Sequence, residues 1–344
     1  MYTPHLVGFV KRRIALGFVL AAALLALLVS LVGSEDILAE LSRADYRVLG
    51  LGLISGALAL TFRGLVWTRF IRVVDETATR REIGWVFLTA MFAKYVTPYG
   101  QLTTEPFVAY LVSTDAEMAY EDGLAGIVSA DVLNYIPYYT FGFLGVGILA
   151  IDGTINNDLR TQLLAFAGLF LLVVSLVYVV LGRPEIVYRV VLGVSERIRR
   201  LLGRVTTRFE EPLSRERITG RLDGFYDSVG DITSDRRALL FATLYAHLGM
   251  VFLMLPVYIG AVGLGYEISL PIVAIVVALG KLGFIIPAPG GVGGVEAMVT
   301  GSLIALASFD PAAALTIALI FRVSTYWLTI VIGGTCAFFL LVRP

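Results

Sequence analysis

Long uninterrupted apolar runs are the feature that most constrains how this sequence can fold. The first run covers residues 14–32 and directly follows the triplet Lys11, Arg12 and Arg13. At a rise of about 1.5 Å per residue, a helix of this length crosses a hydrocarbon core about 30 Å thick. The run also exceeds the roughly 7 to 15 apolar residues of a secretory signal peptide. We therefore expect a retained transmembrane helix rather than a cleaved signal.

Further apolar runs predict that the chain crosses the membrane repeatedly. Because lipid offers no hydrogen-bonding partners to the backbone, such runs cross it as helices. The composition agrees, since 58% of the residues are apolar, 16% are charged and the mean hydropathy is +0.84. A formal net charge of zero gives no basic surface for a nucleic acid. The sequence predicts one all-α polytopic membrane domain over residues 1–344, with further spans at 46–70, 123–151, 163–181, 238–262 and 312–342.

Two more apolar stretches, 83–112 and 270–309, are interrupted near their centres by proline and glycine. The first break is at residues 97–100 and the second at residues 287–291. Each arm on either side is too short to cross a bilayer, so we interpret both stretches as re-entrant helical hairpins. The predicted fold is therefore six transmembrane helices plus two re-entrant hairpins.

The two breaks share a spacing that indicates an internal duplication. Each contains a Pro-x-Gly motif followed five residues later by a glutamate, Glu105 or Glu296, and the two motifs are 191 residues apart. An odd number of predicted crossings separates the copies, so residues 14–151 and 163–342 are predicted to be inverted repeats. Many transporters place a substrate site between the broken helices of such repeats. The same offset also pairs Asp131 with Arg322, Tyr135 with Tyr326, and Arg47 with Ala238.

The distribution of basic residues predicts the orientation. With the amino end in the cytoplasm, 20 of the 27 Lys and Arg residues fall on the cytoplasmic side and 3 on the opposite side. The positive-inside rule then makes both termini cytoplasmic in a cell membrane. The cytoplasmic loop 183–237 holds 12 of these residues, and an apolar face from Val187 to Val205 predicts an amphipathic helix there. Such a helix suits either an anionic leaflet or the end of the helix bundle.

Four glycines at the second break, Gly290, Gly291, Gly293 and Gly294, are candidate substrate-binding residues. They would let backbone N–H groups approach a ligand, and a helix that begins just after them would favour a phosphate. Glu296 would repel an anion unless it is protonated, paired, or used to hold a sugar or an amine. Close helix crossing is the alternative role for the glycines. The sequence leaves both interpretations open.

Charged residues inside apolar spans are the other candidates. An unpaired charge there costs on the order of 3 kcal/mol, so we expect Asp131 and Arg322 to meet at the centre, either as a structural ion pair or as part of a polar pathway. Glu105 either complements a helix dipole or lines that pathway. Lys94 and Lys281 flank the breaks, where each could attract phosphate or snorkel to an interface. The remaining candidates for the lining are Asn134, Tyr135 and Tyr326.

No catalytic residue, metal site or cofactor is predicted. The two histidines, His5 and His247, have no Cys or His partner at a spacing typical of metal ligands. A loose acidic group at residues 115–122 is explained by an exposed loop. The sequence carries no signal for an oligomeric state.

Residues 286–296 and 322–327 resemble a flippase-like integral membrane family that includes the transmembrane region of bacterial lysylphosphatidylglycerol synthases. The block 95–105, with Asp131 downstream, resembles the family's other shared block, although four residues separate Gly100 from Glu105. The resemblance spans nearly the whole chain. It implies translocation, or flipping, of a phospholipid or a polyisoprenyl-phosphate-linked glycan head group, so the expected partner is a membrane lipid or lipid-linked sugar. We expect no lysyl transfer, because no soluble synthase domain follows Pro344.

Two other functional classes remain open from the sequence. One is a non-transporting membrane partner of a lipid-modifying or glycosylation complex, and the other, less favoured, is a membrane-embedded enzyme.

Overall fold

The computed structural model describes residues 19–100, 104–115, 118–151, 157–202, 211 and 214–342. These residues form helices joined by short connections and contain no β-strand, which confirms the predicted all-α class. Parts of several predicted features lie outside the described residues: positions 14–18 of the first span, 101–103 of the hairpin 83–112, and Val205 of the amphipathic helix.

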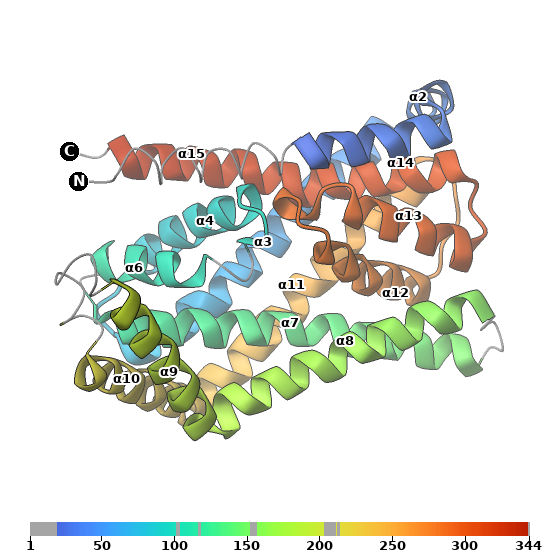
Figure 1. Cartoon of the computed structure of the whole chain (residues 1–344). Helices are drawn as coiled ribbons and strands as arrows, with labels where there is room; N and C mark the ends of the chain where they lie inside the picture. The colour runs from blue at the N-terminus through green and yellow to red at the C-terminus, as the bar shows by residue number, and fades with distance from the viewer. Residues whose placement is uncertain are drawn as a thin grey trace.

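The helices follow one another in three groups (Figure 1). The first group comprises a helix over Val19–Val32, α2 (Ser34–Ser42), α3 (Tyr46–Val74), α4 (Arg80–Val96), α6 (Glu105–Asp115) and α7 (Tyr120–Ile151). The second comprises α8 (Asn157–Gly182), α9 (Pro184–Leu202) and α10 (Arg215–Ser234). The third comprises α11 (Arg236–Gly263), α12 (Leu270–Gly280), η2 (Lys281–Ile285), η3 (Pro289–Gly291), α13 (Gly294–Ala307), α14 (Pro311–Arg322), η4 (Val323–Trp327) and α15 (Leu328–Val342).

The starts of the long helices are fixed by local capping. Asp45 accepts a hydrogen bond from the Arg47 amide at the start of α3 (2.9 Å), and Asp235 accepts one from the Ala238 amide at the start of α11 (2.9 Å). An aspartate at this position satisfies a backbone donor that the helix itself leaves unpaired. The two helices correspond to each other in the predicted halves, and both begin with the same local signal.

The helix bounds reproduce the spacing found in the sequence. Helix α7 covers 120–151, and α14, η4 and α15 together cover 311–342. The first and last residues of these two segments are therefore both 191 positions apart. Both predicted breaks are present, between α4 and α6 and between η2 and α13. In Figure 1, α4 and α6 lie in the half of the bundle nearer α9 and α10, whereas α12 and α13 lie in the half nearer α2. This arrangement fits two hairpins that enter from opposite ends, and their inversion across a bilayer stays a prediction.

The helix lengths make the chain a multi-pass membrane protein. Within the described residues, five helices are long and apolar enough to cross a membrane: 46–74, 120–151, 236–263, 289–307 and 311–340. The predicted spans at 14–32 and 163–181 correspond to helices that bend sharply, by 80° into α2 and by 86° into α9. The sequence predicts residues 289–307 to be one arm of a hairpin, whereas in the structure this segment is long enough to cross a membrane. The reason is that the η3 turn extends the 14 residues of α13.

The amphipathic helix predicted within residues 183–237 is α9, which begins at Pro184 directly after the bend that ends α8. Ile186, Val190, Val194 and Ile198 recur every four residues, and their side chains are exposed in the structure. Part of the apolar face therefore remains uncovered by the bundle. An exposed apolar row with arginines on other faces is typical of a helix that lies at a membrane surface.

Close packing of α3 against the second half holds the two halves together. Helix α3 packs along α11, and Gly56 of α3 lies against the backbone of η4, a single turn of π-helix inside the last span. A Cβ atom at Gly56 would lie 1.8 Å from the Ser324 carbonyl oxygen. Small residues at such crossings let helix backbones approach closely in membranes.

We predict that Gly56→Ala lowers the thermal midpoint of unfolding in detergent, because the added methyl group meets backbone that cannot rotate away. Overpacking of this kind typically costs about 1–3 kcal/mol. Gly50→Ala in the same helix is the matched control, since a Cβ atom there meets nothing within 4 Å. Equal midpoints for the two variants would show that α3 and η4 are not in this contact.

Candidate functional site

A cavity of about 510 Å³ lies beside both breaks, between α7 and α8. Residues from the two breaks, from η2 and from α7 form its polar side, and α8 forms an apolar side opposite. The polar or charged lining residues are Lys94, Thr97, Tyr99, Glu105, Asp131, Tyr135, Tyr138, Tyr139 and Lys281. The apolar residues from α7 and α8 are Val128, Val132, Leu169, Val173, Leu176 and Val177.

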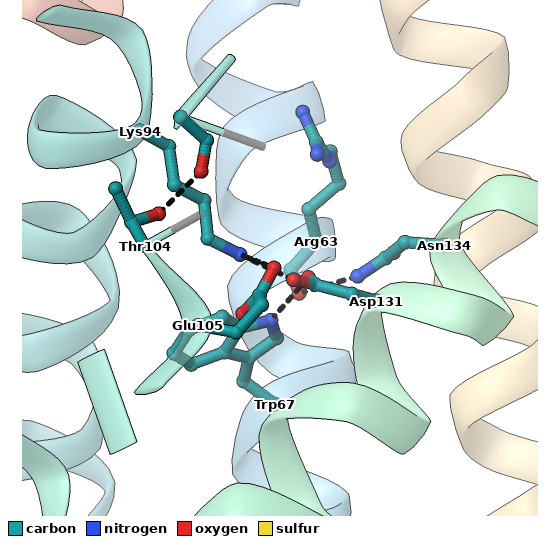
Figure 2. Close-up of polar contacts among 8 residues, drawn as sticks. Arg63, Trp67, Lys94, Thr104, Glu105, Asp131 and Asn134 are labelled. Carbon is teal, nitrogen blue, oxygen red and sulfur yellow. Dashed lines mark hydrogen bonds and ion pairs between the residues drawn. The ribbon is translucent and has the colours of Figure 1, made fainter. Parts of the chain in front are cut away.

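One wall of the cavity is a cluster of three charged residues, Lys94, Glu105 and Asp131, which we call the charged wall (Figure 2). The Lys94 ammonium donates to Glu105 Oε1 at 2.9 Å and also to Asp131 Oδ2. Trp67 Nε1 donates to the other carboxylate oxygen of Asp131 at 3.0 Å. One lysine therefore pairs with two carboxylates, each of which comes from a different helix.

The local structure explains why these side chains meet. Lys94 lies in the last turn of α4, and Glu105 is the first residue of α6, so the first break folds them toward each other. Gly100 lets the chain turn between them, because a Cβ atom there would lie 2.2 Å from the Lys94 carbonyl oxygen. Asp131 projects from α7, which packs against α6. The first break thus places Lys94 and Glu105, which lie on its two sides, next to Asp131 in the long helix α7.

Lys281 is the second cation of the cavity. Its ammonium lies 4.5 Å from the ring centroids of Tyr135 and Tyr138, and 4.8 Å from that of Phe284. No carboxylate of the described chain is within ion-pair distance of it. Aromatic faces attract a cation, each by on the order of 0.5–2 kcal/mol. The rings hold Lys281 in place and no carboxylate of the described residues pairs with it, so an anion that enters the cavity would supply the ion-pair partner.

Arg63 of α3 lies behind the cavity. Figure 2 shows its guanidinium directed away from the charged wall, while its backbone carbonyl accepts a hydrogen bond from Asn134 Nδ2 at 3.4 Å. Its Nε atom is buried and has no partner among the described residues. Arg63 therefore adds a second positive charge without a close carboxylate to the interior.

The second half has its own ion pair, between Arg322 and Glu296. Arg322 Nε donates to Glu296 Oε1 at 2.9 Å, and its NH2 group donates to the Gly290 carbonyl at 2.8 Å. The other Glu296 oxygen accepts from the Gly293 amide at 2.7 Å, which caps α13. Both charged side chains are almost fully buried. This network holds the second break in shape.

The expected direct pair between Asp131 and Arg322 is wrong in this structure. Asp131 binds Lys94, and Arg322 binds Glu296. The physical reason is that each break brings its own glutamate to the long helix of the same half, so each charge is met locally. In the first half the long helix carries an acid, and Lys94 supplies the cation that both acids require.

The glycines of the second break are explained by backbone shape. Gly290, Gly291 and Gly293 have positive φ angles of 57°, 65° and 84°, which other residues rarely adopt. A Cβ atom at Gly290 would lie 2.0 Å from the Tyr326 ring, and one at Gly294 would lie 2.2 Å from the Gly283 carbonyl oxygen. Glu296 occupies the helix start where a phosphate was considered. The structure thus favours the packing role for these glycines.

The structure brings together only part of the predicted site. Six candidates line the cavity: Glu105, Asp131, Tyr135, Lys281, Gly290 and Gly291. The others lie behind its wall: Asn134, Gly293, Gly294, Glu296, Arg322 and Tyr326. Of these, Arg322 lines a smaller cavity of about 40 Å³ that shares Lys281, Tyr138 and Phe284 with the first.

Several site residues were not among the sequence candidates. From the sequence, Lys94 is expected to attract phosphate or to snorkel to an interface, and not to be the partner of two acids, although a lysine in an apolar segment that also contains acids is a usable signal for such pairing. Arg63 carried the same signal. Trp67, Tyr138 and Phe284 gave none, because aromatic residues are common throughout apolar helices.

The cavity reaches the surface of the bundle. Tyr99, Leu176 and Ile285 line it and are also 46%, 59% and 66% exposed. Tyr99 of the first break contacts the Ile285 carbonyl of the second, with its hydroxyl at 3.4 Å. Helix α8 is fastened to α7 through Phe170, whose ring lies 4.9 Å from Tyr139. The opening therefore lies between α8 and the two breaks, where exposed apolar side chains surround it.

Sequence comparisons relate this geometry to known proteins. Residues 14–333 match the model of a family described as the lysylphosphatidylglycerol synthase transmembrane region. A UPF0104 membrane protein of Methanothermobacter thermautotrophicus is 24% identical over 332 residues, or 94% of each chain. A UPF0104 membrane protein of Pyrococcus horikoshii is 21% identical over 319 residues, which cover 92% of this chain and 94% of the relative. The family match includes both breaks and the whole charged wall.

We predict strong coupling between Lys94 and Asp131 and none between Asp131 and Arg322. Lys94→Met and Asp131→Asn should each destabilise the protein, and together they should cost less than the sum of the two losses, by about 0.5–3 kcal/mol. Asp131→Asn combined with Arg322→Met should be additive. Double-mutant cycles on unfolding in detergent measure both terms. Additive losses for the first pair, or coupling only in the second, would contradict the pairing described here.

Proposed function

The chain belongs to the family of lysylphosphatidylglycerol synthase transmembrane regions, and from this premise we propose that it moves a phospholipid, or a head group linked to a polyisoprenyl phosphate, between the leaflets of a membrane. Such a step moves a lipid without making or breaking a covalent bond. The proposed role is therefore that of a translocase and not of an enzyme.

The observation that carries this proposal is the two-sided lining of the cavity. A lipid has a charged head group and apolar chains, and a site for it must offer both environments side by side. Here the charged wall and Lys281 face α8, whose leucines and valines form the opposite side. The exposed Leu176 and Ile285 at the opening allow the chains to remain in the bilayer while the head group enters.

Lys281 is the proposed contact for the head-group phosphate. An ammonium in an apolar setting is costly unless a ligand or counter-ion completes it. The rings of Tyr135, Tyr138 and Phe284 fix its position, so the Lys281 side chain loses little conformational entropy when an anion binds.

The meeting of the two breaks supports a path across the bilayer. The Tyr95 ring of α4 lies 5.4 Å from the Tyr326 ring, and Tyr99 contacts Ile285. Several transporter folds form their substrate site where two interrupted helices meet, and that site opens alternately to either side of the membrane.

We also propose that both termini are cytoplasmic. The carboxyl end of α15 lies at the same end of the bundle as α9 and α10, where the arginine-rich loop is (Figure 1). With Cys336 replaced by serine, a cysteine at Glu216 should react with an impermeant thiol reagent only from the cytoplasmic side, and one at Glu35 only from the outside. The opposite labelling pattern would invert the assignment.

We predict that the purified protein alone moves lipid across liposomes. Phosphatidylglycerol that carries a fluorescent group on one acyl chain should exchange between the outer and inner leaflets. The measured quantity is the fraction of the fluorescence that an impermeant quencher, added outside, does not reach. Protein-free liposomes are the control. A correctly folded protein that leaves the label in one leaflet would favour the alternative role, a non-transporting partner of a lipid-modifying or glycosylation complex.

Within this assay, Lys281→Met should lower the rate by about tenfold or more, as expected from the loss of a charged contact worth about 1.5–3 kcal/mol. Lys281→Arg should retain most of the rate, because arginine keeps the charge and stacks on aromatic rings. Equal rates for Lys281→Met and the wild type would remove Lys281 from the proposed path.

A further inference from the structure

We propose that this translocation is coupled to protons, and that Glu105 carries the proton. The inference rests on the proposed function and adds its energy source. Its basis is the arrangement of the charged wall, where two carboxylates share a single ammonium beside the cavity.

The charge balance of the wall is the first step. With Glu105 and Asp131 both ionised and Lys94 charged, the cluster carries a net charge of −1, and no second cation of the described residues is in ion-pair contact with it. In an interior of low dielectric, an uncompensated charge costs several kcal/mol. A proton on one of the two carboxylates removes this charge. Intramembrane acids with this problem are frequent proton carriers in transporters.

The bonding of the two acids selects Glu105. Asp131 accepts from Trp67 with one oxygen and from Lys94 with the other, so both of its oxygens are engaged as acceptors. Glu105 accepts from Lys94 with Oε1 only, and its Oε2 atom has no partner among the described residues. A proton added at Glu105 Oε2 therefore breaks no existing hydrogen bond, whereas one added at Asp131 would.

The groups that face Glu105 come from every element packed against it. Helix α4 contributes Lys94, α7 contributes Asp131 and Tyr135, and η2 contributes Lys281 to the same cavity. Arg63 of α3 is directed away from the wall (Figure 2). Lys281 is thus the one cation of the described cavity lining that no carboxylate neutralises, and it balances the excess negative charge only from a distance.

An anionic head group changes this balance. When its phosphate contacts Lys281, that positive charge no longer offsets the charged wall, and the phosphate adds repulsion. Proton binding to Glu105 then becomes more favourable, and by reciprocity a protonated Glu105 raises the affinity for the anion. In each transport step a proton from water on one side joins the Glu105 carboxylate, crosses with the lipid, and returns to water on the other side. An anionic lipid and a proton together carry no net charge, so the pH gradient drives the step and the membrane potential does not.

The test uses the full protein in liposomes that contain a trace of chain-labelled phosphatidylglycerol. With an imposed difference of one pH unit, the labelled lipid should accumulate in the leaflet that faces the higher pH, at a ratio approaching about tenfold for one proton per lipid. Dissipating the gradient with a protonophore should restore an equal distribution. Wild-type protein that moves lipid equally with and without the gradient would overturn the coupling while leaving the proposed function intact. Wild-type protein that moves no lipid under either condition would overturn the proposed function itself.

Variants identify the residue. Glu105→Gln, whose side chain cannot take up or release a proton, should lose the response to the gradient, so that any lipid it moves reaches the same distribution with and without the pH difference. Glu105→Asp keeps a carboxylate and should retain the response. Glu121→Gln is the matched control in α7, because Glu121 pairs with Arg221 outside the cavity and should respond as the wild type does. A persistent gradient response in folded Glu105→Gln would exclude Glu105 as the carrier. The wild-type response tests the coupling whether or not this variant folds.

Discussion

The cost of placing charge in an apolar interior is the constraint on which the rest of this structure depends. Each interrupted helix carries a glutamate in its first turn after the break, and each glutamate pairs with a buried cation, Lys94 for Glu105 and Arg322 for Glu296. The cation and the glutamate of each pair come from different elements, so each pair fixes how a broken helix folds back on the bundle. The breaks are stable because their charges are satisfied within the same half.

The two halves differ in how completely the glutamate at the break is paired, and the cavity lies beside the less completely paired one. In the second half the network of Arg322, Glu296 and the Gly290 carbonyl is closed and buried. In the first half the charged wall borders a cavity and leaves one carboxylate oxygen without a partner among the described residues. One half thus serves mainly as a rigid support, whereas the other presents groups that can change partners.

The sequence predicted the architecture better than the site. Apolar length, two Pro-x-Gly breaks and one offset of 191 residues were enough to place the long helices and both interruptions, because they depend on local chain properties. The partner of Asp131 depends on how the chain turns at Gly100 after the end of α4, and the periodicity of apolar residues in the sequence contains no information about that turn. Likewise, the aromatic residues around Lys281 come from α7 and η2, and only packing brings them together. The expected Asp131–Arg322 pair failed because symmetry relates positions, whereas charges pair with whichever opposite charge is nearest.

The sharp bend between α8 and α9 also sets a depth. A helix with an exposed apolar row and arginines on its other faces lies where hydrocarbon meets water, so the bend at Pro184 marks that boundary. The cavity residues of α8, from Leu169 to Val177, lie 7 to 15 residues before Pro184. At about 1.5 Å per residue they are roughly 10–23 Å below the boundary, which brackets the midplane of a hydrocarbon core about 30 Å thick. A head group bound in the cavity, as proposed, would therefore lie near the midplane, at similar distances from the two leaflets.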